Sequence, residues 1–117
     1  MKNVRNPDAI HPPLAAYSHQ VEISGERLLI MAGQLGRRAA RPRAANVLAN
    51  LEAADMEVGD LVKLTLYFVE EIDAPTRGGI LARRLGEHRP AMTLVYIARL
   101  AAPPLLVEVD AWASASG

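Results

Sequence analysis

Residues 89–113 constrain the fold most, because they contain two strands of different character. In the first, the apolar residues 94–97 (Leu-Val-Tyr-Ile) follow one another without a polar break, so both faces of that strand need covering. The second strand alternates, with one face apolar and the other carrying Leu106, Glu108, Asp110 and Trp112. The Ala-Ala-Pro-Pro segment 101–104 predicts a tight connection between them, and therefore a terminal hairpin.

Hydrophobic periodicity predicts the other elements of one domain, residues 1–117, in the order ββαβαββ. An extended arm (1–13) precedes strands 17–23 and 27–32, which we expect to form a hairpin through the turn at 24–26. A helix starts near Pro42, buries Val47, Leu48 and Leu51, and stops before Gly59. Strand 61–69 follows, and a second helix runs from an Asp73 cap to Gly86.

Two helices cover only one face of such a sheet, which predicts a two-layer α+β sandwich. The other face, including half of strand 94–97, is left without an intrachain cover. A contiguous apolar surface of that kind is typical of an interface. We therefore expect a homo-oligomer with cyclic symmetry.

Composition excludes several classes of function. The 117 residues carry a formal net charge of zero, which argues against a dedicated nucleic-acid or membrane binder. The chain has no cysteine, and His11, His19 and His88 lack metal-ligand spacing, so we expect no metal. No apolar run approaches the ~20 residues that span a bilayer, and a cytoplasmic location is expected.

Several short motifs follow one another in an order that resembles one family. They are Pro13-x-x-x-Tyr17-Ser18-His19, Ile30-Met31-Ala32-Gly33-Gln34, Asn46-Val47-x-x-x-Leu51-Glu52-Ala53-Ala54, Gly59-Asp60-Leu61-Val62-Lys63-Leu64-Thr65, Arg89-Pro90-Ala91 and Leu106-Val107-Glu108-Val109-x-Ala111. Together they resemble the Rid family (RidA/YjgF), the reactive-intermediate imine deaminases, over nearly the whole chain. The resemblance implies a chorismate-mutase-like ββαβαββ fold, a homotrimer, and a cleft between subunits. In active members that cleft hydrolyses enamines and imines derived from amino acids, without a cofactor.

The resemblance also points to site residues and to departures from the family pattern. Tyr17 and Glu108 match the tyrosine and the glutamate that line the cleft, and Gly33 and Gln34 match its Gly-Gln segment. The arginine that holds the substrate carboxylate in deaminating members is replaced by Met92. Ala32 stands where a serine is usual and Gly78 where an asparagine is usual. Arg37, Arg77 or Arg89 would have to supply a missing positive charge.

Each of these residues has an ordinary alternative reading. Glu108 either activates water or is an acid at a sheet end paired with a basic side chain; Tyr17 either meets a ligand or closes the core. Met92 is expected to make the pocket apolar. The leading hypothesis is a trimer that binds a small molecule without a carboxylate and hydrolyses imines weakly through Glu108. The alternatives are a non-catalytic, ligand-binding or regulatory trimer and, less favoured, a ribonuclease.

Overall fold

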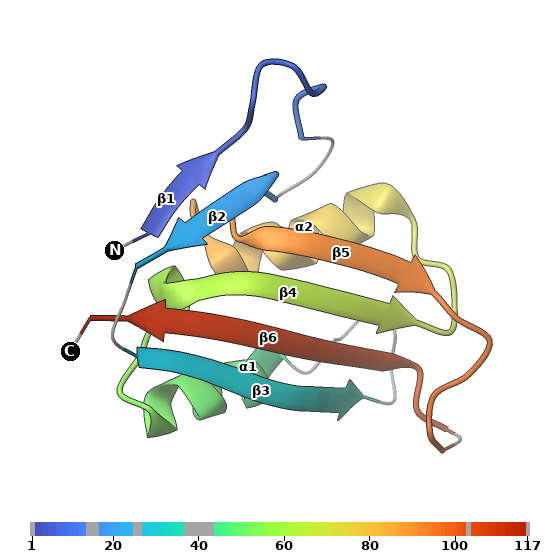
Figure 1. The fold of residues 1–117 in the computed structure, drawn as a ribbon. Helices are drawn as coiled ribbons and strands as arrows, with labels where there is room; N and C mark the ends of the chain where they lie inside the picture. Colours follow the sequence, from blue (N-terminus) through green and yellow to red (C-terminus); the bar gives the residue numbers. More distant parts are fainter. Residues whose placement is uncertain (1, 14–16, 25–26, 37–43, 103, 117) are drawn as a thin grey trace.

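The computed structural model describes residues 2–13, 17–24, 27–36, 44–102 and 104–116. These residues form a mixed α+β fold (Figure 1). Its elements are β1 (Lys2–Arg5), β2 (Gln20–Ile23), β3 (Arg27–Gly36), α1 (Ala44–Ala53), the short 3₁₀ helix η1 (Val58–Asp60), β4 (Leu61–Phe68), α2 (Ala74–Leu85), β5 (Ala91–Tyr96) and β6 (Val107–Ala115). From β2 onward this is the predicted order ββαβαββ; β1 lies in the segment predicted as an extended arm.

The main sheet has the strand order β3-β6-β4-β5. Strand β6 is antiparallel to both of its neighbours, whereas β4 and β5 run parallel and are connected through α2. Strands β1 and β2 form a separate antiparallel pair, which lies alongside β5 (Figure 1). Ser18 joins the two parts, because it bridges Ala91 and its N–H donates to the carbonyl of Pro90 at 3.0 Å.

Both predicted hairpins are wrong. Strand β2 pairs with β1 instead of β3, and β6 pairs with β3 and β4 instead of β5. The connection after β5 therefore crosses the end of β4 before β6 begins. A parallel pair needs a crossover, and α2 already supplies one between β4 and β5. Once β5 occupies one side of β4, β6 takes the other.

Both helices cover the same face of the main sheet, here called the helix face (Figure 1). The core lies between them and the sheet, and β6 contributes its smallest side chains there: Val107, Ala111 and Ala113 are 0% exposed. From α1, Leu51 is buried at 1% exposure, whereas Leu48 at 37% lies at the edge of the packed surface. The predicted two-layer arrangement is thereby confirmed.

The ends of α2 follow the predicted signals. The Asp73 carboxylate accepts hydrogen bonds from the N–H of Thr76 at 3.0 Å and from its hydroxyl, and these bonds hold the pKa of Asp73 below its usual value. Gly86 ends the helix at φ +61°, a conformation that disfavours a side chain. No helix in the described parts of the chain is long and apolar enough to cross a membrane.

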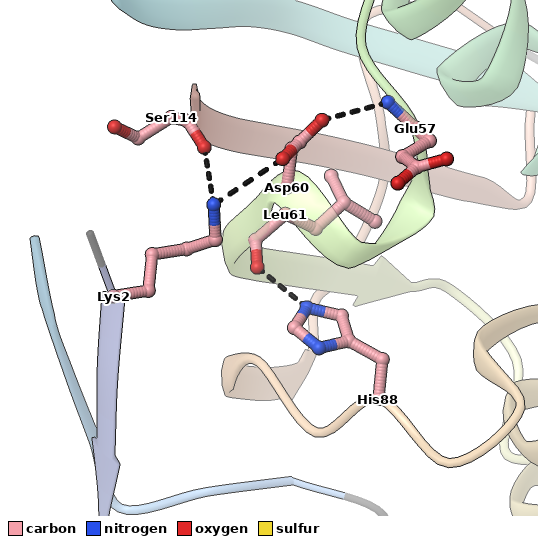
Figure 2. Close-up of polar contacts among 6 residues, drawn as sticks. All are labelled: Lys2, Glu57, Asp60, Leu61, His88 and Ser114. Carbon is pink, nitrogen blue, oxygen red and sulfur yellow. Dashed lines mark hydrogen bonds and ion pairs between the residues drawn. The ribbon is translucent and has the colours of Figure 1, made fainter. Parts of the chain in front are cut away.

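A polar network attaches the amino-terminal strands to the end of the main sheet (Figure 2). The Lys2 ammonium contacts Asp60 Oδ1 at 3.3 Å and donates to the carbonyl of Ser114. The other oxygen of Asp60 accepts the N–H of Glu57, and His88 Nε2 donates to the carbonyl of Leu61 at 2.7 Å. His88 thus has a structural partner where β4 begins.

Burial within α1 generates a first prediction. Leu51→Ala should lower the free energy of unfolding by ~2–5 kcal/mol, because it leaves a cavity in the core. Leu48→Ala, in the same helix, should lower the free energy of unfolding by well under half of that amount, since Leu48 is partly exposed. Denaturant unfolding of the two variants checks the pair. Equal losses would mean that the assigned core face of α1 is wrong.

One glycine inside α2 and the glycine that ends this helix give a second prediction, in which the two substitutions have opposite effects on stability. A Cβ built at Gly79 meets nothing within 4 Å, so Gly79→Ala should stabilise the protein by ~0.5–1 kcal/mol through higher helix propensity. Gly86→Ala also meets open space but sits at φ +61°, so it should destabilise by ~1 kcal/mol. Thermal unfolding of both variants measures the contrast, and shifts of the same sign would contradict it.

Candidate functional site

The candidate site lies on the sheet face opposite the helices, here called the open face. Strand register places the side chains of Glu108, Tyr67 and Val95 on it side by side, with Asp110 and Trp112 further along β6. Several of its apolar side chains are exposed: Leu28 (51%), Ile30 (59%), Val95 (37%) and Trp112 (43%). The alternation read from the sequence of β6 therefore separates core from open face as predicted.

Glu108 lies against an irregularity of the neighbouring strand. The pairing of β3 with β6 shifts register between Met31 and Gln34, which leaves Ala32 and Gly33 in a bulge. A Cβ added at Gly33 would overlap the Glu108 carboxylate and its Cγ. Gly33 is therefore required for the observed position of this carboxylate, and the structure brings these two predicted site residues together.

Tyr67 and Asp110 complete the polar part of the open face. The Tyr67 hydroxyl donates to Asp110 Oδ2 at 3.0 Å. This hydrogen bond, followed by partial burial and by the negative charges of Asp110 and Glu108, raises the pKa of Tyr67. Sequence reasoning placed Asp110 on the same face as Glu108 but assigned no role to either Asp110 or Tyr67. The contact depends on the register of β4 against β6, which no local pattern reveals.

Gln34 and Ala32 make a local contact at the bulge. The Gln34 side-chain amide donates to the carbonyl of Ala32 at 2.8 Å. Ala32 itself is exposed. Both residues thus flank Gly33 in the sequence, and the described contacts do not join either of them to the Glu108 carboxylate.

The other predicted site residues lie elsewhere in the chain. Met92 pairs with Leu64 on the helix face and packs partly against the core, so the sheet separates it from Glu108. Tyr17 is next to Ser18, which forms a β-bridge with Ala91 at the start of β5. The Tyr17 ring lies edge-on to the His19 ring, with the ring centroids 5.7 Å apart. Gly78 lies within α2, with open space where a Cβ would stand. Within a single subunit, Met92, Tyr17 and Gly78 therefore do not lie together with Glu108.

Two of the arginines considered as carboxylate partners are engaged away from Glu108. Arg77 donates to the Tyr96 hydroxyl at 2.9 Å and to the carbonyl of Ile72. Arg89 donates to the carbonyls of Gly86 and His88. Arg37 lies outside the described residues. In the described part of the chain, Glu108 forms no ion pair with an arginine.

Histidines and acids do not form a metal centre in the described residues, where no group of three or more suitable side chains could hold an ion. His11 and His19 contact each other edge-on, with ring centroids 5.4 Å apart, and His19 Nε2 donates to the carbonyl of His11. Both belong to the loop between β1 and β2, where they stabilise the turn of the chain.

Comparison with known proteins agrees with this geometry. Residues 8–115 match the family described as endoribonuclease L-PSP. A RutC family protein of Pyrococcus horikoshii is 33% identical over 66 residues, which cover 56% of this chain and only 52% of that relative. The Rid-family protein YyfB of Yersinia pestis has a similar crystal structure, with a TM-score of 0.83, 27% identity and coverage of 97% of this chain and 98% of that one.

A second solved structure extends the comparison. A protein of unknown function from Pseudomonas aeruginosa is 32% identical, with a TM-score of 0.62, and the match covers 97% of this chain and 94% of that chain. The family match spans the bulge at Gly33, the open face and Glu108 alike. The chain therefore belongs to the Rid family (YjgF, endoribonuclease L-PSP).

Proposed function

We propose that this protein forms a homotrimer and binds a small molecule in pockets between subunits, where Glu108 slowly hydrolyses an imine or enamine that lacks a carboxylate. The observation that carries the proposal is the position of Glu108. Its carboxylate lies over a glycine bulge on a sheet face that no described segment of the chain covers. No cofactor is required for this chemistry.

The exposed apolar side chains of the open face support assembly. Leu28, Ile30, Val95 and Trp112 come from three strands and share this face with the candidate site. Apolar surface that is contiguous over several strands is characteristic of interaction sites. A closed cyclic arrangement would cover it on every subunit.

The separation of the predicted site residues supports a pocket built from two subunits. Glu108 lies near the end of β4, whereas Tyr17 and Met92 lie where β5 begins. Three residues of strand, or ~10 Å, separate the register positions of Val95 and Met92. A neighbouring subunit that presents its β5 start to this Glu108 would bring the two halves together, with Met92 as an apolar wall.

The proposed reaction needs only water and one carboxylate. Glu108 accepts a proton from water as the water oxygen adds to the imine carbon. That proton passes to the nitrogen and gives a carbinolamine. Glu108 then transfers the proton of the carbinolamine hydroxyl to the nitrogen as the C–N bond breaks, so that ammonia leaves and a carbonyl compound remains. Carboxylates commonly carry out such proton transfers when they lie within hydrogen-bond reach.

The acidic character of the open face supports a substrate without a carboxylate. Glu108 and Asp110 give this face two negative charges against the one positive charge of Lys63, which donates to Thr93, and Arg77 and Arg89 bond to groups elsewhere. Loss of one partner from a buried charge pair costs ~2–5 kcal/mol, which is roughly 30-fold to several-thousand-fold in affinity. The same acids would repel RNA phosphates, so ribonuclease activity is the less supported function.

Assembly is tested by light scattering at micromolar concentration, where we expect a trimer near three times the 12.6 kDa chain mass. Replacement of Ile30 by aspartate should shift the population toward monomer, because it places a charge in the proposed interface. Leu48→Asp provides the control, since Leu48 is exposed on the helix side of the sheet. A wild-type protein that stays monomeric would overturn the proposed pocket.

Catalysis is tested with two imines of similar size, one bearing a carboxylate and one not. The wild type should hydrolyse the carboxylate-free imine faster, and Glu108→Gln should remove most of that activity. Gly33→Ala should also reduce activity, because the added methyl displaces the carboxylate without removing it. Gly79→Ala is the matched control with an open site.

Met92→Arg supplies the complementary test. If the variant remains folded and trimeric, turnover of the carboxylate-bearing imine should rise, because a charged fork is restored in the pocket. A double variant with Glu108→Gln should lose that gain. Preferential turnover of carboxylate-bearing imines by the wild type would contradict the proposed substrate class. Binding without any turnover would favour the non-catalytic alternative.

A further inference from the structure

The hydroxyl of Tyr67 has one hydrogen, and in the structure this hydrogen is donated within the protein. Tyr67 donates it to Asp110 Oδ2 at 3.0 Å. A phenol has one hydrogen to donate and also accepts through its oxygen. Toward any molecule that approaches over the open face, Tyr67 therefore presents only an acceptor.

Glu108 stands directly opposite Tyr67 in the pairing of β6 with β4, while Asp110 lies two residues further along β6. Side chains of directly opposed residues start ~4.5–5.5 Å apart, close enough for one bound group to contact both. An ionised carboxylate is also an acceptor only. The Glu108 carboxylate lies at Gly33 and the Tyr67 oxygen at Asp110 Oδ2, so a nitrogen that lies between Glu108 and Tyr67 would find an acceptor on each side.

We infer that Asp110 acts as a positioning residue: it holds the Tyr67 hydroxyl so that Tyr67 offers only an acceptor to a ligand. Tyr67 thereby determines specificity. The site then prefers cationic nitrogens with at least two N–H bonds over equally charged nitrogens with none. The inference rests on the proposed function, because it concerns the same pocket. Among the class of ligands considered, a primary ammonium or an unsubstituted iminium satisfies both acceptors. A quaternary ammonium carries the same charge and satisfies neither.

Two further observations, the pKa of Tyr67 and a hydrogen bond of Lys63, support this assignment. The raised pKa of Tyr67 keeps its phenol protonated at neutral pH and above, so that the hydrogen bond to Asp110 persists. Lys63, which is also on the open face, donates to Thr93 Oγ1 at 2.6 Å. The lysine ammonium is thus engaged with a hydroxyl and is not bonded to the two acceptors.

The test compares butylammonium with butyltrimethylammonium, and Trp112 reports binding. It is the only tryptophan in the chain and lies on the open face two residues from Asp110. The wild type should bind butylammonium at least ~10-fold more tightly, since hydrogen bonds to charged groups are the stronger kind. Tyr67→Phe should lower this ratio several-fold, because Glu108 alone is left to accept from the ligand, whereas Tyr96→Phe removes a hydroxyl that contacts Arg77 and should leave the ratio unchanged.

Asp110→Ala tests the positioning role itself. Without Asp110, the phenol is free to donate to Glu108 and to compete with the ligand, so the ratio should fall several-fold. The pKa of Tyr67, followed by NMR of labelled tyrosine, should fall as well, because its largest cause is removed. A purely structural role for Asp110 would also lower this pKa but would leave the ratio unchanged.

The outcomes separate this inference from the proposed function. Binding of both cations with equal affinity, lost in Glu108→Gln, would overturn the inference and leave the proposed site standing. Absence of binding of either cation would overturn both. An unchanged ratio in folded Tyr67→Phe would show that another group selects the N–H donors and would reject the role given to Tyr67.

Discussion

Strand β6 is packed between β3 and β4, and its alternating side chains determine both the core and the site. On the helix face, Val107, Ala111 and Ala113 are fully buried, and their small size lets the helix layer approach the sheet closely. On the open face the same strand presents Glu108, Asp110 and Trp112. A register slip of one residue would exchange these two sets, placing two carboxylates in the core. The burial of the small apolar residues therefore fixes the orientation of the acids.

The bulge in β3 adds a second constraint on the site. If β3 paired regularly with β6 along its whole length, the β3 backbone beside Glu108 would form an ordinary antiparallel ladder without a bulge. The extra residue between Met31 and Gln34 instead places Gly33 beneath the carboxylate, where any side chain would collide with it. The glycine at this position is thus explained by the close approach of the Glu108 side chain.

Sequence reasoning found most elements because hydrophobic periodicity is local. The Asp73 cap, the Gly86 stop and the alternation of β6 were all predictable from neighbouring residues. Strand partners were not, because periodicity identifies the buried face of a strand but not the strand beside it. The pairing of β2 with β1 and the insertion of β6 beside β4 follow from the whole topology. The Tyr67–Asp110 contact was missed for the same reason, while Glu108 stood out as an acid in an apolar strand.

The resemblance that aligns Met92 with the family's arginine implies a different charge balance for a ligand in the proposed pocket. With an arginine in the pocket, an acid such as Glu108 has a counterion, and a zwitterionic substrate can satisfy both charges. In this chain Asp110 adds a second carboxylate to the open face, and its phenolic partner Tyr67 offers an oxygen without adding positive charge. Lys63 adds one positive charge to this face and donates to Thr93. Two carboxylates beside one ammonium leave a net negative charge, which a cationic ligand would compensate when subunits cover the face. The same acidic face that disfavours an amino-acid-derived carboxylate would therefore favour a cation.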